Sequence, residues 1–281
     1  MRKLCGIAVL FVVLTLALGS CGVGELFSTS LAKDSNRLTR ADIGSADDAQ
    51  RLLEQAKNDP AASRSLLDKI LGLAGDENIS DAEKQELLGA AAAAAVQASD
   101  IGGLILGAAS SLDVQSLGSG SGEPEDYAKL IQDLLDAAES RDVAGISDEM
   151  AGAFAGSYDP DGTLSDEVLA GMGKTPQEQD TNLGLLALSL LLGQLEPDAD
   201  ITKYAGDDNS FAEDPAGAMG EIFRGLETDG ADSVSDIIEI NPSLKLLDAT
   251  IGSIGKDGHE VTDPIAKQLG AFWNSLKGVA S

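Results

Sequence analysis

The side chains that could do chemistry are 47 carboxylates, two cysteines and a single histidine, His259. Metal sites and nucleophilic triads use histidine, and here either would depend on His259 alone. Carboxylate pairs act as acid and base in hydrolases, but among so many acids no particular pair stands out. Aromatic residues make up only 4% of the chain, which leaves few rings to stack on a sugar. We therefore expect no catalytic residue, no cofactor and no metal, with His259 a solvated turn residue.

One acidic turn has the residue types of a calcium site. Residues 159–163 (DPDGT) resemble the middle of an EF-hand loop, with glycine at the sharp turn. That loop needs Asp at its first position and a bidentate Glu at its last, where this chain has Ser157 and Val168. Glu167 comes one residue too early. We expect an acidic turn that caps a helix, and calcium binding is the alternative.

The chain begins with the layout of a secretory signal. Two basic residues are followed by an uncharged, mostly apolar stretch from Leu4 to Gly24. This stretch contains Leu18-Gly19-Ser20-Cys21, in which an aliphatic residue and two small residues precede a cysteine. The four residues resemble the lipobox of bacterial lipoproteins.

The resemblance implies a lipid anchor on Cys21. In that family the cysteine thiol receives a diacylglycerol, the preceding peptide (here 1–20) is removed, and the new amine is usually acylated, as with palmitate. Gly22 stands where the inner-membrane retention signal has Asp, so the outer membrane is the expected destination. The alternative is an uncleaved transmembrane anchor, because about 20 apolar residues span a bilayer.

The charge is strongly negative. The chain has a formal net charge of −28, and loss of residues 1–20 would remove Arg2 and Lys3 and no acid. Nucleic acids and anionic headgroups need a basic surface, so we exclude both as partners. Such a charge repels itself at low salt, and it permits divalent cations without requiring them.

The hydrophobic pattern predicts an all-α fold. Apolar residues, mostly leucine and alanine, recur at helical spacing in four stretches: 49–56, 66–74, 127–138 and 265–276. Alternating strand patterns are nearly absent, and Val234–Ile240 is the best strand candidate. We divide the chain into a signal peptide (1–20), a flexible tether (21–44) and an α-helical domain (45–281). A Gly/Ser-rich linker lies near 116–125 inside that domain.

Two segments are apolar on all sides. Leu87–Leu112 contains one charge, Asp100, and Leu183–Leu195 contains none. The second is too short to span a membrane, and the first is rich in alanine and interrupted by glycines. We predict two core helices surrounded by other helices, with membrane insertion as the alternative.

A recurring pattern predicts three helix–turn–helix corners. Gly75, Gly156 and Gly255 each end a helical stretch, and a polar turn follows each of them. The next helix then opens with an aliphatic residue, Ser or Thr, and Asp, as at 79–81, 164–166 and 261–263. The hydroxyls Ser80, Ser165 and Thr262 should be the N-caps. The pattern also suggests a threefold internal repeat, for which convergent capping is the alternative.

These observations favour a lipid-anchored protein of the bacterial cell envelope that is not an enzyme. We expect a helical scaffold that binds another protein, since helical arrays offer concave surfaces. A periplasmic carrier that holds an apolar ligand between Leu87–Leu112 and Leu183–Leu195 is the alternative. A carboxylate-based hydrolase ranks third.

Overall fold

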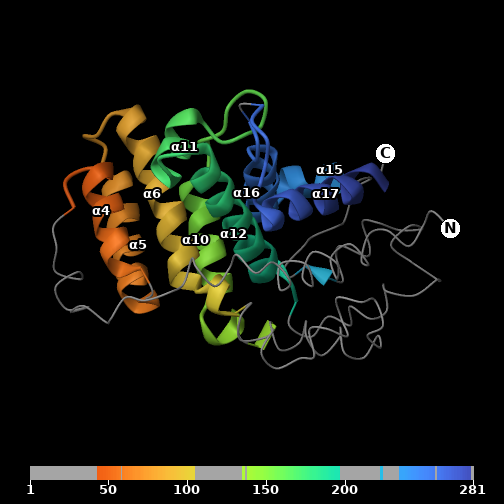
Figure 1. Cartoon of the computed structure of the whole chain (residues 1–281), viewed down its shortest axis with the longest axis horizontal. Helices are drawn as coiled ribbons and strands as arrows, with labels where there is room; N and C mark the ends of the chain where they lie inside the picture. The colour runs from red at the N-terminus through yellow and green to blue at the C-terminus, as the bar shows by residue number, and fades with distance from the viewer. Residues whose placement is uncertain are drawn as a thin grey trace.

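The computed structural model describes residues 43–57, 59–104, 135–136, 138–196, 222–223, 234–256 and 258–279. These residues form helices and no strand, and only two isolated β-bridges occur among them, Tyr158 with Leu164 and Leu195 with Phe223. The all-α prediction is confirmed (Figure 1). Residues 1–42 with Cys21, and the linker at 116–125, lie outside the described residues, as does most of the predicted helix 127–138.

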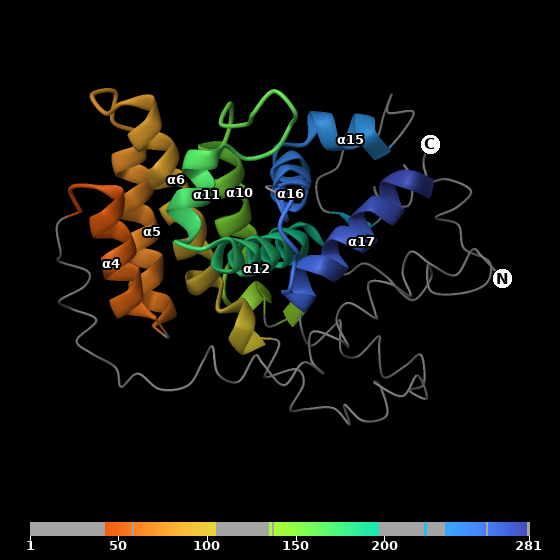
Figure 2. The ribbon, with the colours of Figure 1, turned by 45° about the horizontal axis from the view of Figure 1, so that its top comes forward.

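Three helices lie side by side at the N-terminal end: α4 (Ala46–Ala56), α5 (Pro60–Ala74) and α6 (Asp81–Ser99) (Figures 1 and 2). Each begins at a residue whose side-chain oxygen accepts from a backbone N–H of the first turn: Ser45, Asp59 and Ser80. Such caps satisfy donors that a helix leaves unpaired at its start. The α4 helix buries Ala49, Leu52, Leu53 and Ala56, the face expected from the sequence.

The α6 helix is the centre of the fold. It packs against α5 and α11 most extensively and also against α4, α10 and α12. Its alanines, from Ala90 to Ala95, are almost all buried, which lets neighbouring helices approach closely. By length and composition the stretch Asp81–Leu104 could cross a bilayer, and 78% of its apolar window is buried inside the protein. The prediction of a core helix over Leu87–Leu112 agrees with this packing as far as Ser99, where α6 ends at a left-handed Asp100, and residues 105–112 lie outside the described residues.

The middle of the molecule consists of α10 (Val143–Ala153), α11 (Asp166–Met172) and α12 (Pro176–Gln194). In the tilted view α12 crosses below α11 and α10 (Figure 2). It contacts α6 and α10 on one side and α16 and α17 on the other. Its second half is buried from Leu186 to Gln194, so the second apolar segment is also a core helix.

The C-terminal part contains α15 (Val234–Ile240), α16 (Pro242–Gly252) and α17 (Pro264–Val279). The strand candidate Val234–Ile240 is therefore a helix. Its buried residues, Val234, Ile237 and Ile238, are spaced three and four apart, while Ser235, Asp236 and Glu239 are exposed. That spacing matches one face of a helix rather than alternate sides of a strand.

Two of the three predicted caps are confirmed and one is wrong. Backbone N–H groups of Glu83 and Val168 donate to Ser80 Oγ and Ser165 Oγ, each at 3.2 Å. For α17 the cap is Asp263 rather than Thr262, because Ala266 N–H donates to Asp263 Oδ1 at 2.9 Å. The next residue is proline, which is favoured at the first helical position and places the cap just before it.

The structure does not show a threefold repeat. Gly156 and Gly255 have positive φ, +83° and +70°, but Gly75 has φ −81° and no left-handed turn. The helix pairs also pack differently, since α5 lies along α6 whereas α10 and α11 each pack on α6. The three corners therefore differ in their capping residues, in their glycine conformations and in how their helices pack.

Candidate functional site

A groove of about 550 Å³ lies between α4, the end of α6 and the start of α12. Its floor is apolar, with Leu53, Ala93, Val96, Met172 and Leu185. Its rim is polar and exposed, and includes Glu54, Lys57, Lys174, Gln177 and Glu178. The volume falls in the range of small-molecule or short-peptide sites.

Three amide side chains beside the groove bond to the carbonyls at the end of α11. Gln50 Nε2 donates to the carbonyls of Ala170 and Gly171 at 3.1 and 3.0 Å, and Asn182 Nδ2 donates to Met172 O at 2.6 Å. Gln179 Nε2 donates to Gly173 O at 3.0 Å. These carbonyls end α11, and the last carbonyls of a helix lack partners within the helix. The donors of these amides are therefore already used in bonds that hold α11 between α4 and α12.

Two of the groove's three acids are engaged as well. Glu178 Oε2 accepts from the backbone N–H groups of Lys174 and Thr175, at 2.9 and 3.2 Å, in the capping box of α12. Asp100 Oδ2 lies 3.0 Å from Arg141 Nη2. Only Glu54 remains, so the groove does not present a pair of facing acids of the kind that a hydrolase uses.

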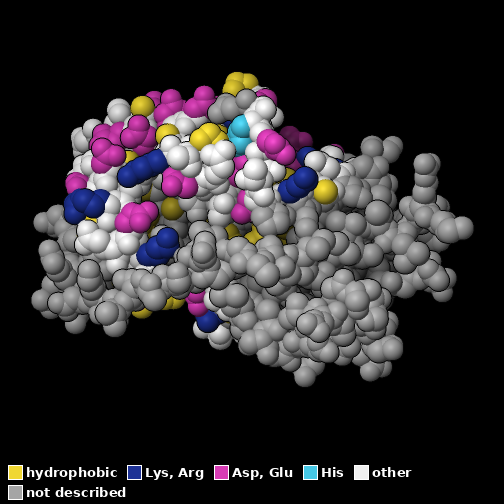
Figure 3. All heavy atoms as spheres, viewed as in Figure 1, with side chains coloured by type: hydrophobic (Ala, Val, Ile, Leu, Met, Phe, Trp, Pro, Cys, Tyr) yellow, Lys and Arg dark blue, Asp and Glu magenta, His cyan; other side chains and the backbone are white. Residues whose placement is uncertain are grey.

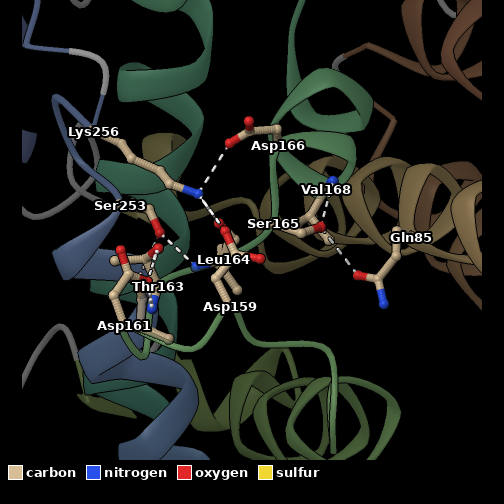
Figure 4. Close-up of polar contacts among 11 residues, drawn as sticks. Gln85, Asp159, Asp161, Thr163, Leu164, Ser165, Asp166, Val168, Ser253 and Lys256 are labelled. Carbon is tan, nitrogen blue, oxygen red and sulfur yellow. Dashed lines mark hydrogen bonds and ion pairs between the residues drawn. The ribbon is translucent and has the colours of Figure 1, made fainter.

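The acidic turn at 159–163 is occupied by a lysine (Figure 4). The Lys256 ammonium lies 2.6 Å from Asp159 Oδ2, 2.9 Å from Asp166 Oδ1 and 2.9 Å from Leu164 O. Burial disfavours the charge, but hydrogen bonds to the two aspartates outweigh it and raise the pKa of Lys256. An ammonium thus sits where these oxygens converge.

The second aspartate of the turn has a different role. Asp161 Oδ1 accepts from Thr163 N–H at 3.0 Å and from Thr163 Oγ1 at 2.7 Å. These bonds lower the pKa of Asp161. In the part of the chain that is described, no group of three or more His, Cys, Asp or Glu residues could hold a metal ion.

His259 is not the solvated turn residue that was expected. Its Nε2 lies 2.7 Å from Oδ2 of Asp180, a carboxylate that is only 2% exposed. The other oxygen of Asp180 accepts from Gly255 N–H at 3.0 Å. The pair resembles the base and orienting acid of a triad, but His259 Nδ1, the nitrogen that would face a substrate, is buried. We interpret the pair as a structural contact that holds the loop before α17 against α12.

The side chains that build these sites were not singled out in the sequence. Gln50, Asn182, Asp180 and Lys256 act on backbone or side chains 10 to 121 positions away. The capping box Thr175-Pro176-Gln177-Glu178 was not predicted either, although its Thr-x-x-Glu pattern is a local signal that the sequence carries.

Acidic and basic side chains are mixed over the face in Figure 3, and the only histidine is visible among them. No family model, no curated protein and no solved structure matches this chain.

Proposed function

We propose that this chain is a non-enzymatic binding module of the bacterial cell envelope, lipid-anchored through Cys21, which takes a segment of a partner protein into the groove. The observation that carries the proposal is the apolar floor beneath an exposed polar rim. Its walls are helices that pack on a shared neighbour, since α6 contacts both α4 and α12, so the groove is held in shape without a ligand. Preformed sites of this kind bind at low ordering cost.

The geometry favours this function over the two others. Both apolar helices contribute to the floor, through Ala93, Val96 and Leu185, as a carrier would require. The rim is open to solvent, however, and an apolar cargo would remain partly wet. A hydrolase is disfavoured because Glu178 and Asp100 are already bonded to protein groups.

Site-specific photocrosslinking in intact cells tests the proposal. Benzoylphenylalanine at Gln177 on the rim should give a discrete protein adduct, whereas the same probe at exposed Ala271 on α17 should not. Filling the floor with Ala93→Phe should remove the adduct. Equal adducts from both positions, or an adduct that survives Ala93→Phe, would contradict the proposal.

A further inference from the structure

We propose that the groove holds a segment of this chain's own tether, residues 31–40, until a partner protein displaces it. The inference rests on the proposed function and adds how access to the same groove is regulated. It follows from the charge of this segment, from the helix at which the tether ends, and from the acids on that helix.

The segment differs in charge from the rest of the mature chain. Residues 31–40 (LAKDSNRLTR) contain three basic residues and one acid, a net charge of +2, and beyond residue 40 no ten-residue window exceeds +1. The segment also contains two leucines, Leu31 and Leu38. It therefore offers apolar side chains for the floor together with a charge that the remainder of this acidic chain attracts.

The tether ends at the helix that forms one wall of the groove. Ile43 packs against the core and lies three residues before α4, which supplies Gln50, Leu53 and Glu54 to the lining. The α4 helix has 11 residues and is about 16 Å long. Leu31 lies 12 residues before Ile43, and that length of chain spans up to about 40 Å. The segment is therefore long enough to turn back along the whole of α4.

Two unpaired acids lie on the groove side of α4. Asp47, Gln50 and Glu54 are spaced three and four residues apart, so they share one face of the helix. Gln50 and Glu54 line the groove, and Asp47 continues this face toward the start of α4. Asp47 and Glu54 are exposed, and neither has a described hydrogen bond or ion pair. The basic residues of the segment would therefore pass two free carboxylates on the way to the floor.

The charges of the lining give the inference a sign. The lining contains three acids, Glu54, Asp100 and Glu178, and two lysines, Lys57 and Lys174. Lys57 follows Glu54 by one turn, at the end of α4 away from the tether. Glu54 attracts the basic segment and Lys57 repels it, so removal of the two charges should change docking in opposite directions. A purely apolar contact would respond to neither change.

A segment on the same chain needs little affinity of its own. Because a short stretch of chain joins it to α4, its effective concentration at the groove is on the order of millimolar. A partner protein must exceed this competition before it occupies the floor. The docked tether would therefore set a threshold for the binding that we propose above.

Photocrosslinking within the full chain, at one copy per phosphatidylcholine nanodisc, tests this inference. Benzoylphenylalanine at Leu38 should crosslink to peptides that line the groove, which mass spectrometry identifies after proteolysis. Peptides of α17, with its exposed Ala271, report untargeted contact and should carry on the order of tenfold less crosslink, because a segment at millimolar effective concentration is held near the groove.

Variants then separate charge from reach. The double variant Arg37→Gln with Arg40→Gln should lower the groove crosslink about two- to threefold, as should Glu54→Gln, and Lys57→Gln should raise it about twofold. Glu77→Gln, at an exposed acid in the turn after α5, is the matched control and should change nothing. Raising sodium chloride from about 20 to 500 mM should lower the yield, because salt screens exposed charges.

The outcomes distinguish this inference from the function on which it rests. If the Leu38 probe labels the groove and α17 equally, or if no charge variant alters the yield, the tether inference is wrong, and the partner adduct at Gln177 still decides the function. If the Leu38 probe labels the groove but Gln177 gives no partner adduct, even in the double arginine variant, the tether inference holds and the proposed function fails. If both hold, the double arginine variant should raise the partner adduct at Gln177 about two- to threefold in cells, because the competing segment is weakened.

Discussion

The side chain of Lys256 bears on the two interpretations of the acidic turn at 159–163, a helix cap and a calcium site. Its side chain is 18% exposed, and its ammonium joins Asp159 and Asp166 to the turn that follows α16. A calcium ion would need at least six oxygens, including a bidentate carboxylate. A lysine needs three acceptors, which Asp159, Leu164 and Asp166 supply.

Replacing this lysine should destabilise the fold in a pH-dependent way. Lys256→Met should lower the free energy of unfolding by about 2 kcal/mol near neutral pH, because it leaves two carboxylates without their cation. The folded pKa of Lys256 is raised, so its contribution is fully present below about pH 10.4 and is lost as pH rises through the folded value. Urea titrations at pH 8 and pH 11.5 measure this difference.

The control for that measurement is Lys267→Met, whose exposed ammonium has no described ion pair, and it should differ from the natural chain at neither pH. An equal loss from Lys256→Met at both pH values would show that packing of the aliphatic chain, rather than charge, is what Lys256 contributes.

The lipobox resemblance predicts a covalent lipid on the sulfur of Cys21. Cells fed radiolabelled palmitate should label the natural chain, and Cys21→Ala should abolish the label, because the lipobox resemblance assigns both thioether and amine acylation to this residue. Cys5→Ala is the matched control and should keep the label. Label that persists in Cys21→Ala would remove the lipid anchor from the proposed function.

At the scale of elements, α6 and α11 cross with their backbones in close contact at Gly89 and Gly171. A Cβ at Gly89 would lie 2.7 Å from the Cα of Gly171 and would overlap the carbonyl oxygen of Val168. A Cβ at Gly171 would overlap the carbonyl oxygen of Glu86 in turn. The two glycines let the backbones touch, which brings the end of α11 to the amides of the groove.

Gly89→Ala should therefore force these helices apart and cost about 2 kcal/mol or more of unfolding free energy. Gly72→Ala is the matched control within α5, because nothing lies within 4 Å of its Cβ position. Alanine there should stabilise the helix by about 0.5–1 kcal/mol. Chemical denaturation of both variants gives the two signs, and a neutral Gly89→Ala would refute the crossing.

The N-caps give a graded prediction across two helices. Ser80→Ala removes one cap bond from α6 and should cost about 1 kcal/mol. Ser165→Ala should cost more, because Ser165 Oγ also donates to Gln85 Oε1 at 3.2 Å and ties α11 to α6 (Figure 4). Thermal melts of the two variants rank the losses, and the reverse order would argue against the α6–α11 link.

At the scale of the whole molecule, the sequence predicted the features that depend on residues close together in the chain. Helical spacing predicted the buried face of α4, the all-round apolar stretch Leu183–Leu195 predicted a core helix in α12, and local capping predicted Ser80 and Ser165. The groove depends instead on contacts such as Gln50 with Gly171, 121 positions apart, which only the packing of α6 brings together. The contact of Lys256 with Asp159, 97 positions apart, is another long-range contact that the sequence pattern did not predict.

The net charge predicts how salt changes the stability of the whole chain, because charge repulsion acts on the whole molecule rather than on one site. At −28 the folded protein repels itself, and salt screens that repulsion within about 10 Å at 0.1 M. Raising sodium chloride from 20 to 500 mM should therefore raise the melting temperature. Millimolar calcium should do no more than sodium chloride of matched ionic strength, because Lys256 already holds Asp159 and Asp166. A calcium-specific rise that disappears in the double variant Asp159→Ala with Asp161→Ala would mean that calcium displaces the lysine and that the turn is a binding loop after all.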